Sequence, residues 1–129
     1  MSSSSVGKQT VMVVEDSQDV RELMALQLRL SGYHVIEAGD GLEAVELARE
    51  NCPALIFMDI QMPGLDGLAA TRTIRGIAEL CEVVIAAFSA FSSGDNRERA
   101  IEAGCNEYVS KSVGVNRLAG IAGHYLTAA

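Results

Sequence analysis

The stretch Leu55–Gly67, LIFMDIQMPGLDG, decides the fold. An apolar run ends in the carboxylate of Asp59, and a loop that contains Pro63 and Gly64 follows. A short apolar run bounded by turn residues is typical of a buried strand. The apolar neighbours of such a strand cannot solvate a charge at its end. Asp59 therefore needs a partner that its own strand does not supply.

On both sides of this stretch, short β-rich runs alternate with longer runs of helical periodicity. The expected strands cover residues 10–16, 33–38, 54–59, 82–90 and 106–111. The expected helices cover residues 17–32, 40–50, 67–76, 93–104 and 115–126. Strict alternation of strands and helices predicts an α/β fold, doubly wound, with helices on both faces of a parallel sheet.

The helix expected at residues 17–32 shows the signals behind these boundaries. Ser17 is the predicted N-cap and Gly32 the predicted end. The apolar residues at helical spacing are expected to face the core, and these are Val20, Leu23, Met24 and Leu28. Asp40 and Asp66 are the corresponding predicted starts of the next two helices.

Composition and charge restrict the classes of protein. With 129 residues, 49% apolar and 21% charged, the chain has the size and composition of one globular domain. Its net charge of −7 argues against a nucleic-acid or anionic-membrane surface. No apolar run approaches the roughly 20 residues that span a bilayer, and no signal-peptide pattern opens the chain. We expect a cytoplasmic protein.

The ends of the chain and the cysteines add little chemistry. Residues 1–8 are rich in serine and are interpreted as a disordered tail or a cloning remnant, whereas residues 9–129 form the expected domain. Cys52, Cys81 and Cys105 have no metal-ligand spacing, which indicates reduced thiols. Cys81 and Cys105 are expected to be partly exposed.

The residues that end the predicted strands carry the chemistry. In parallel α/β sheets, ligands bind outside the carboxyl ends of the strands. Those ends carry Glu15, Asp16, Asp59, Ser89 and Lys111. Three carboxylates, a hydroxyl and an ammonium group are therefore expected to converge on one edge of the sheet.

This set of groups suits magnesium and phosphoryl transfer. Carboxylates that lie close together repel one another unless a cation intervenes. An all-oxygen acidic site favours Mg²⁺, which keeps room for a phosphoryl group. Asp59 is then both a ligand and a nucleophile that forms an aspartyl phosphate. Lys111 and Ser89 supply the positive charge and the hydroxyl that phosphoryl oxygens need.

The motifs VVEDS, MDIQMPGLDG, FSA and YVSK, at these positions, resemble the receiver domain of two-component response regulators. The resemblance covers the chain from Gln9 onward. It implies the flavodoxin-like (βα)5 fold with strand order 2-1-3-4-5. It also implies that Asp59 is the phosphoacceptor and that Mg²⁺ is bound by Glu15, Asp16, Asp59 and the main-chain carbonyl of Gln61. Ser89 and Lys111 would contact the phosphoryl group.

The resemblance also implies a partner and a switch. A histidine kinase or a histidine phosphotransfer protein would donate the phosphoryl group. Ser89 would then move inward and Tyr108 would rotate, which changes the face formed by residues 93–104, 106–111 and 115–126. The chain would be a phosphoacceptor that assists its own phosphorylation and dephosphorylation, not an enzyme. A monomer or a weak, phosphorylation-linked dimer is expected.

Two positions are of interest in comparison with the family: one departs from its usual pattern, and the other is variable. Receivers usually place a proline with a cis peptide after the lysine, but here the residue is Ser112. A cis bond before a non-proline residue costs roughly 2.5–4 kcal/mol, so we expect a trans peptide. Phe91 is expected to shield the acyl phosphate and slow its hydrolysis, so that Phe91→Glu shortens the phosphoryl half-life.

Several alternatives stay open at this point. Asp16 could cap a helix, Ser89 could be a turn residue, and Tyr108 could be a half-buried edge aromatic. One alternative function is a phosphohydrolase with an aspartyl nucleophile, which would require a DxD motif on the first strand and a cap for the substrate. Another is a flavin carrier, which would require a Ser/Thr/Gly-rich phosphate loop. A pseudo-receiver that binds partners without phosphorylation is the main rival. The kinase, the stimulus and the downstream target are not predicted.

Overall fold

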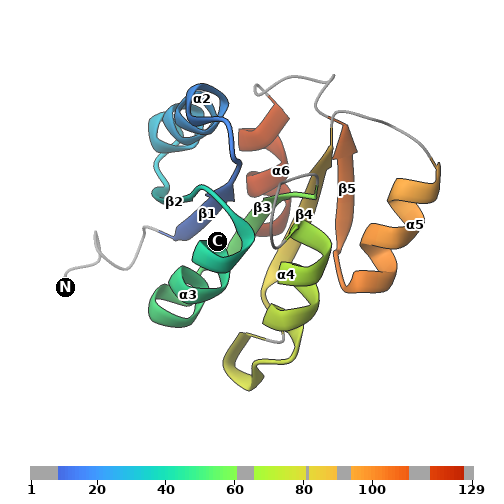
Figure 1. Cartoon of the computed structure of the whole chain (residues 1–129). Helices are drawn as coiled ribbons and strands as arrows, with labels where there is room; N and C mark the ends of the chain where they lie inside the picture. Colours follow the sequence, from blue (N-terminus) through green and yellow to red (C-terminus); the bar gives the residue numbers. More distant parts are fainter. Residues whose placement is uncertain (1–8, 61–65, 81, 90–93, 111–116, 127–129) are drawn as a thin grey trace.

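The computed structural model describes residues 9–60, 66–80, 82–89, 94–110 and 117–126 (Figure 1). Its strands are β1 (Thr10–Val14), β2 (His34–Ala38), β3 (Leu55–Asp59), β4 (Val84–Ser89) and β5 (Glu107–Ser110). Its helices are α2 (Gln18–Leu30), α3 (Gly41–Asn51), α4 (Gly67–Arg75), the short 3₁₀ helix η1 (Ala78–Leu80), α5 (Gly94–Ala103) and α6 (Arg117–Leu126).

The five strands form one parallel sheet in the order β2-β1-β3-β4-β5. This confirms the predicted flavodoxin-like fold and its strand order. The register aligns the carboxyl ends: Val14 of β1 pairs with Met58 of β3, and Asp59 pairs with Phe88 of β4. The residues that follow β1 are therefore carried to the side of Asp59.

Helices cover both faces of the sheet (Figure 1). Helices α2 and α6 pack on one face, where Phe57 and Phe88 place their ring centroids 5.9 Å apart. Helices α3, α4 and α5 pack on the other face, against Ile56 and Met58. Because side chains alternate along a strand, successive residues of β3 belong to opposite cores, and all five are buried. The continuous apolar run before Asp59 follows from this double coverage.

The predicted helix starts are confirmed. The side chain of Ser17 accepts a hydrogen bond from the Val20 amide at 3.5 Å. The carboxylate of Asp40 accepts one from Glu43 at 2.8 Å, and that of Asp66 accepts one from Ala69 at 2.8 Å. Each satisfies an amide that the first turn of a helix leaves without a helical partner.

Three expectations were wrong. The first strand ends at Val14, so Glu15 and Asp16 lie just beyond it. Val20 and Leu23 do not face the core as Met24 and Leu28 do; both are exposed. Cys105 is buried beside Thr71, with 3.8 Å between Sγ and Oγ1, and burial raises the pKa of its thiol. Cys81 lies outside the described residues.

Candidate functional site

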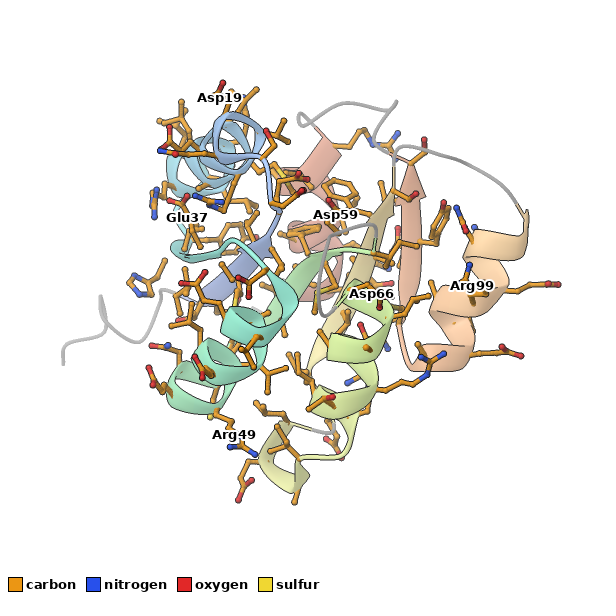
Figure 2. The ribbon with its side chains drawn as sticks, viewed as in Figure 1. Asp19, Glu37, Arg49, Asp59, Asp66 and Arg99 are labelled. Atoms are coloured by element: carbon orange, nitrogen blue, oxygen red, sulfur yellow. The ribbon has the colours of Figure 1, made fainter. Side chains whose placement is uncertain are left out.

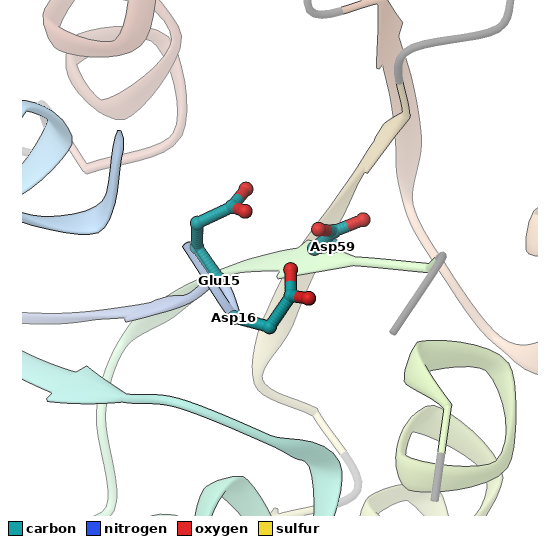
Figure 3. A group of neighbouring side chains, drawn as sticks. All are labelled: Glu15, Asp16 and Asp59. Carbon is teal, nitrogen blue, oxygen red and sulfur yellow. The ribbon is translucent and has the colours of Figure 1, made fainter. Parts of the chain in front are cut away.

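Three carboxylates gather at the carboxyl edge of the sheet, as the sequence predicted. Glu15 and Asp16 follow β1, and Asp59 is the last residue of the adjacent strand β3. Each offers a carboxylate oxygen within 4.8 Å of the other two (Figure 3). Figure 2 places Asp59 near the middle of the molecule, between the two layers of helices.

The three acids differ in their exposure to solvent. Glu15 is 2% exposed and Asp59 is 1% exposed, whereas Asp16 lies at the surface. Buried carboxylates at this separation destabilise each other unless a positive charge is present. Among the three acids, Asp16 is therefore the one whose side chain reaches solvent.

The donors fit a magnesium ion. An octahedral Mg²⁺ with ligands at 2.0–2.1 Å separates them by roughly 3.0 Å for neighbours and 4.2 Å for opposite ligands. The oxygens of Glu15, Asp16 and Asp59 lie within 4.8 Å of one another, close to the spacing of the ligands of such an ion. All three donors are carboxylate oxygens, which Mg²⁺ prefers to nitrogen or sulfur.

Local structure fixes two of the acids. The Ser17 amide donates a hydrogen bond to Oε2 of Glu15 at 3.1 Å, so the start of α2 orients that carboxylate. Gly67 lies directly against the main chain of Asp59 and Ile60, where a Cβ atom would overlap the Asp59 carbonyl. The first turn of α4 is therefore packed against the end of β3, and this contact requires glycine.

Ser89 and Tyr108 lie on the next two strands. Ser89 ends β4 and is fully buried, one residue beyond the Phe88 that pairs with Asp59. Tyr108 lies in β5, opposite Ala87, and is half-buried against the core on the α3–α4–α5 face. The structure thus brings Ser89 to the edge that carries the acids and places Tyr108 one strand further along.

Several predicted features fall outside the described residues. These are the residues Gln61, Phe91, Lys111 and Ser112 and the peptide bond between Lys111 and Ser112. They stay predictions from the sequence.

The sequence analysis missed the support behind Glu15. Nη1 of Arg21 donates a hydrogen bond to the Glu15 main-chain carbonyl at 3.0 Å. Every residue has a carbonyl, so no sequence pattern marks such an acceptor. The only available signal was the position of an arginine four residues after the N-cap Ser17, on the helix that follows the acidic pair.

Among the helices of the described residues, none is long and apolar enough to cross a membrane.

Known proteins are similar to this chain in sequence and in fold. The family profile described as response regulator receiver domain matches residues 11–122. The polar-differentiation response regulator DivK of Brucella ovis is 40% identical over 108 residues, which cover 84% of this chain and 88% of DivK. The chemotaxis protein CheY4 of Vibrio cholerae superposes with a TM-score of 0.88 at 22% identity, over 93% of this chain and 100% of that chain; this similarity supports the fold alone.

A second structure bears on the metal. The receiver domain of the sensor histidine kinase PA1611 from Pseudomonas aeruginosa PAO1 has a magnesium ion coordinated in its active site cleft. It is 32% identical, covers 95% of this chain and 100% of its own, and has a TM-score of 0.86. Taken with the family match and the acidic edge of the sheet, these comparisons show that the chain belongs to the receiver-domain family of response regulators.

Proposed function

We propose that this receiver domain accepts a phosphoryl group on Asp59 from a phosphohistidine of a histidine kinase or a histidine phosphotransfer protein. A carboxylate oxygen of Asp59 forms the new bond to phosphorus as the phosphorus–nitrogen bond of the donor breaks. The imidazole leaves with the bonding electron pair and takes a proton from solvent. The observation that carries this proposal is the buried carboxylate of Asp59 within 4.8 Å of two other acids.

Magnesium, when bound, would neutralise charge on the phosphoryl oxygens and on the acids. We assign its binding to Glu15, Asp16, Asp59 and the main-chain carbonyl of Gln61. Glu15 is oriented by the Ser17 amide, and Asp59 is held by the contact of its main chain with Gly67. These two acids therefore keep their positions while the third, Asp16, stays accessible from solvent.

Ser89 and Lys111 are the proposed contacts for the phosphoryl oxygens. The hydroxyl of Ser89 lies at the end of the strand next to β3, the position from which it would donate to a group on Asp59. Tyr108 is the proposed switch, since it lies one strand further along and is only half-buried. Its rotation would alter the face formed by α5, β5 and α6.

The surface of α2 supports a protein as the donor. Helix α2 begins directly after Glu15 and Asp16, and three of its leucines are exposed: Leu23 by 47%, Leu26 by 49% and Leu30 by 74%. At about 100° of rotation per residue, these leucines lie on the side opposite the core residues Met24, Ala25 and Leu28. An apolar stripe on the solvent side of a helix is typical of a contact with another protein.

Intact-mass analysis tests the proposal. The wild type and Asp59→Asn are incubated with a small phosphodonor, with and without Mg²⁺. We expect a gain of about 80 Da, the mass of one added phosphoryl group, only in the wild type and only with the metal. No gain in any sample would favour the pseudo-receiver, and continuous release of phosphate with many turnovers would favour the phosphohydrolase.

We also propose a cytoplasmic location and a monomer or weak dimer whose association depends on phosphorylation. The second point is measured by light scattering of the phosphorylated and unphosphorylated protein. A stable dimer that does not respond to phosphorylation would contradict it.

A further inference from the structure

Arg21 joins the acidic site to the neighbouring strand. Its guanidinium donates from Nη1 to the carbonyl of Glu15 at 3.0 Å, and its Nε lies 3.3 Å from Oε1 of Glu37 on β2. The side chain is 18% exposed, so the fork is largely enclosed between α2 and the sheet. The guanidinium lies beside Gly39, where a Cβ atom would come within 3.3 Å of Nη1.

The carboxylate of Glu37 is shared by two arginines. Its Oε2 lies 3.3 Å from Nη1 of Arg29, which is 49% exposed and donates from Nη2 to the carbonyl of Val35 at 3.1 Å. Glu37 therefore supplies a counter-charge for Arg21 on the side away from the acidic site. Arg29 has the same ionic partner, and its hydrogen bonds to Glu37 and to the carbonyl of Val35 both go to β2.

The contact to the Glu15 carbonyl acts on Asp16. The peptide group between the two residues is planar, so fixing its carbonyl also fixes its amide and limits where the Asp16 side chain begins. Asp16 is exposed, unlike the buried Glu15 and Asp59. On the other side of Glu15, its amide donates to the carbonyl of Ala38 at 3.1 Å. The hydrogen bonds from Glu15 to β2 and from Arg21 to Glu15 thus anchor the chain just before Asp16.

We propose that Arg21, held by Glu37, is a positioning residue for the magnesium site: it fixes the Glu15–Asp16 peptide so that the Asp16 carboxylate is ready for the ion. The inference rests on the proposed function, because it assigns the metal to these acids. Outer partners that orient metal ligands typically contribute 10–100-fold to metal affinity.

The sign of the effect separates this role from two simpler ones. If Arg21 acted only through its positive charge, removing it would make the site more negative and Mg²⁺ binding tighter. If Arg21 served only as a bridge between α2 and β2, removing it would lower the stability and leave the affinity unchanged. Of the three roles, only positioning predicts that removal of Arg21 weakens Mg²⁺ binding.

Calorimetric titration with MgCl₂ tests the proposal on the full chain. We expect Arg21→Gln to weaken Mg²⁺ binding by about tenfold, the lower end of the range for such partners. Arg29→Gln is the matched control. It removes one positive charge and one contact with Glu37 but keeps the hydrogen bond from Arg21 to the Glu15 carbonyl. Its affinity should match that of the wild type. The thermal midpoint of each variant, without metal, records any loss of stability separately.

Glu37→Gln provides a second test that keeps Arg21 in place. It removes the ionic partner of the guanidinium, and we expect a smaller loss of affinity in the same direction. Equal or tighter binding in Arg21→Gln, or an equal loss in Arg29→Gln, would overturn the inference while leaving the proposed function intact. Absence of Mg²⁺ binding by the wild type would instead overturn the proposed function together with this inference.

Discussion

Asp59→Asn is expected to stabilise the protein in the absence of Mg²⁺. The substitution keeps the size of the side chain and its capacity to form hydrogen bonds but removes one negative charge from the acidic site. Without metal, Asp59 and Glu15 are both buried and repel each other. Relief of this repulsion favours the folded state, in which the two groups are close, and has no effect on the unfolded chain.

The separation of the carboxylates sets the magnitude. Their oxygens lie within 4.8 Å of each other. At that upper limit, two unit charges repel by about 0.9 kcal/mol in bulk water and by about 3.5 kcal/mol at an effective dielectric constant of 20. Favourable contacts of Asp59 with other groups offset part of this. We therefore expect Asp59→Asn to raise the free energy of unfolding by about 1–3 kcal/mol without metal.

Magnesium should narrow the difference in stability between the two proteins. At ten times its dissociation constant, a ligand that binds only the folded state stabilises it by about 1.4 kcal/mol. For a chain of 129 residues, this shifts the thermal midpoint by about 5 °C. The wild type should show this shift. Asp59→Asn lacks one of the three carboxylate ligands and should show little of it.

Urea unfolding measures the free energy of unfolding, and thermal unfolding measures the shift of the midpoint. Both are followed by circular dichroism, because the chain has no tryptophan for a fluorescence signal. Each protein is unfolded in EDTA and again in Mg²⁺. Glu46→Gln is the control, since it removes one exposed carboxylate that lies on α3, outside the acidic site. The reasoning is refuted if Asp59→Asn is less stable than the wild type in EDTA, or if Mg²⁺ stabilises both equally.

Further predictions concern the packing, the surface and the far end of the sheet. Gly67→Ala should lower the free energy of unfolding by about 2 kcal/mol, because its Cβ would overlap the end of β3. Gly120 lies on α6 with open space around it, so Gly120→Ala should raise the free energy of unfolding by roughly 0.5–1 kcal/mol in the same assay. Leu26→Gln should slow phosphorylation by a histidine-containing protein donor but not by a small phosphodonor; equal slowing of both would argue against the stripe on α2 as the contact. The hydrogen bond to Glu107 raises the pKa of Tyr125 to about 12. The stability it gives is fully present below about pH 10 and is lost as the pH rises toward 12. Glu107→Gln should therefore move the tyrosinate absorbance of Tyr125 to lower pH, and an unchanged titration would contradict the assignment.

Much of the fold was predictable because several local signals agree. Asp40 and Asp66 mark helix starts through their side-chain oxygens, and both contacts are present. The apolar run before Asp59 predicted a buried strand, and all five residues of β3 are buried. Once the strands are parallel, the residues at their carboxyl ends share one edge, so the meeting of Asp59 with Glu15 follows from topology.

Other features depend on contacts that a sequence does not encode locally. Helix α2 carries apolar residues on opposite sides, so periodicity did not reveal that Met24 faces the sheet while Leu23 faces solvent. Cys105 is buried because it meets Thr71, far away in the chain. The bond from Arg21 goes to a main-chain oxygen, which has no residue-specific signal.

The most direct measurement is the location of the phosphoryl group on the chain. The wild type is phosphorylated in Mg²⁺, digested, and sequenced by mass spectrometry, and the same is done in EDTA. We predict a single modified residue, Asp59, and no modification in EDTA. A phosphoryl group on any other residue, or one acquired equally well in EDTA, would contradict the claim that a cation allows these crowded acids to coexist and one of them to react.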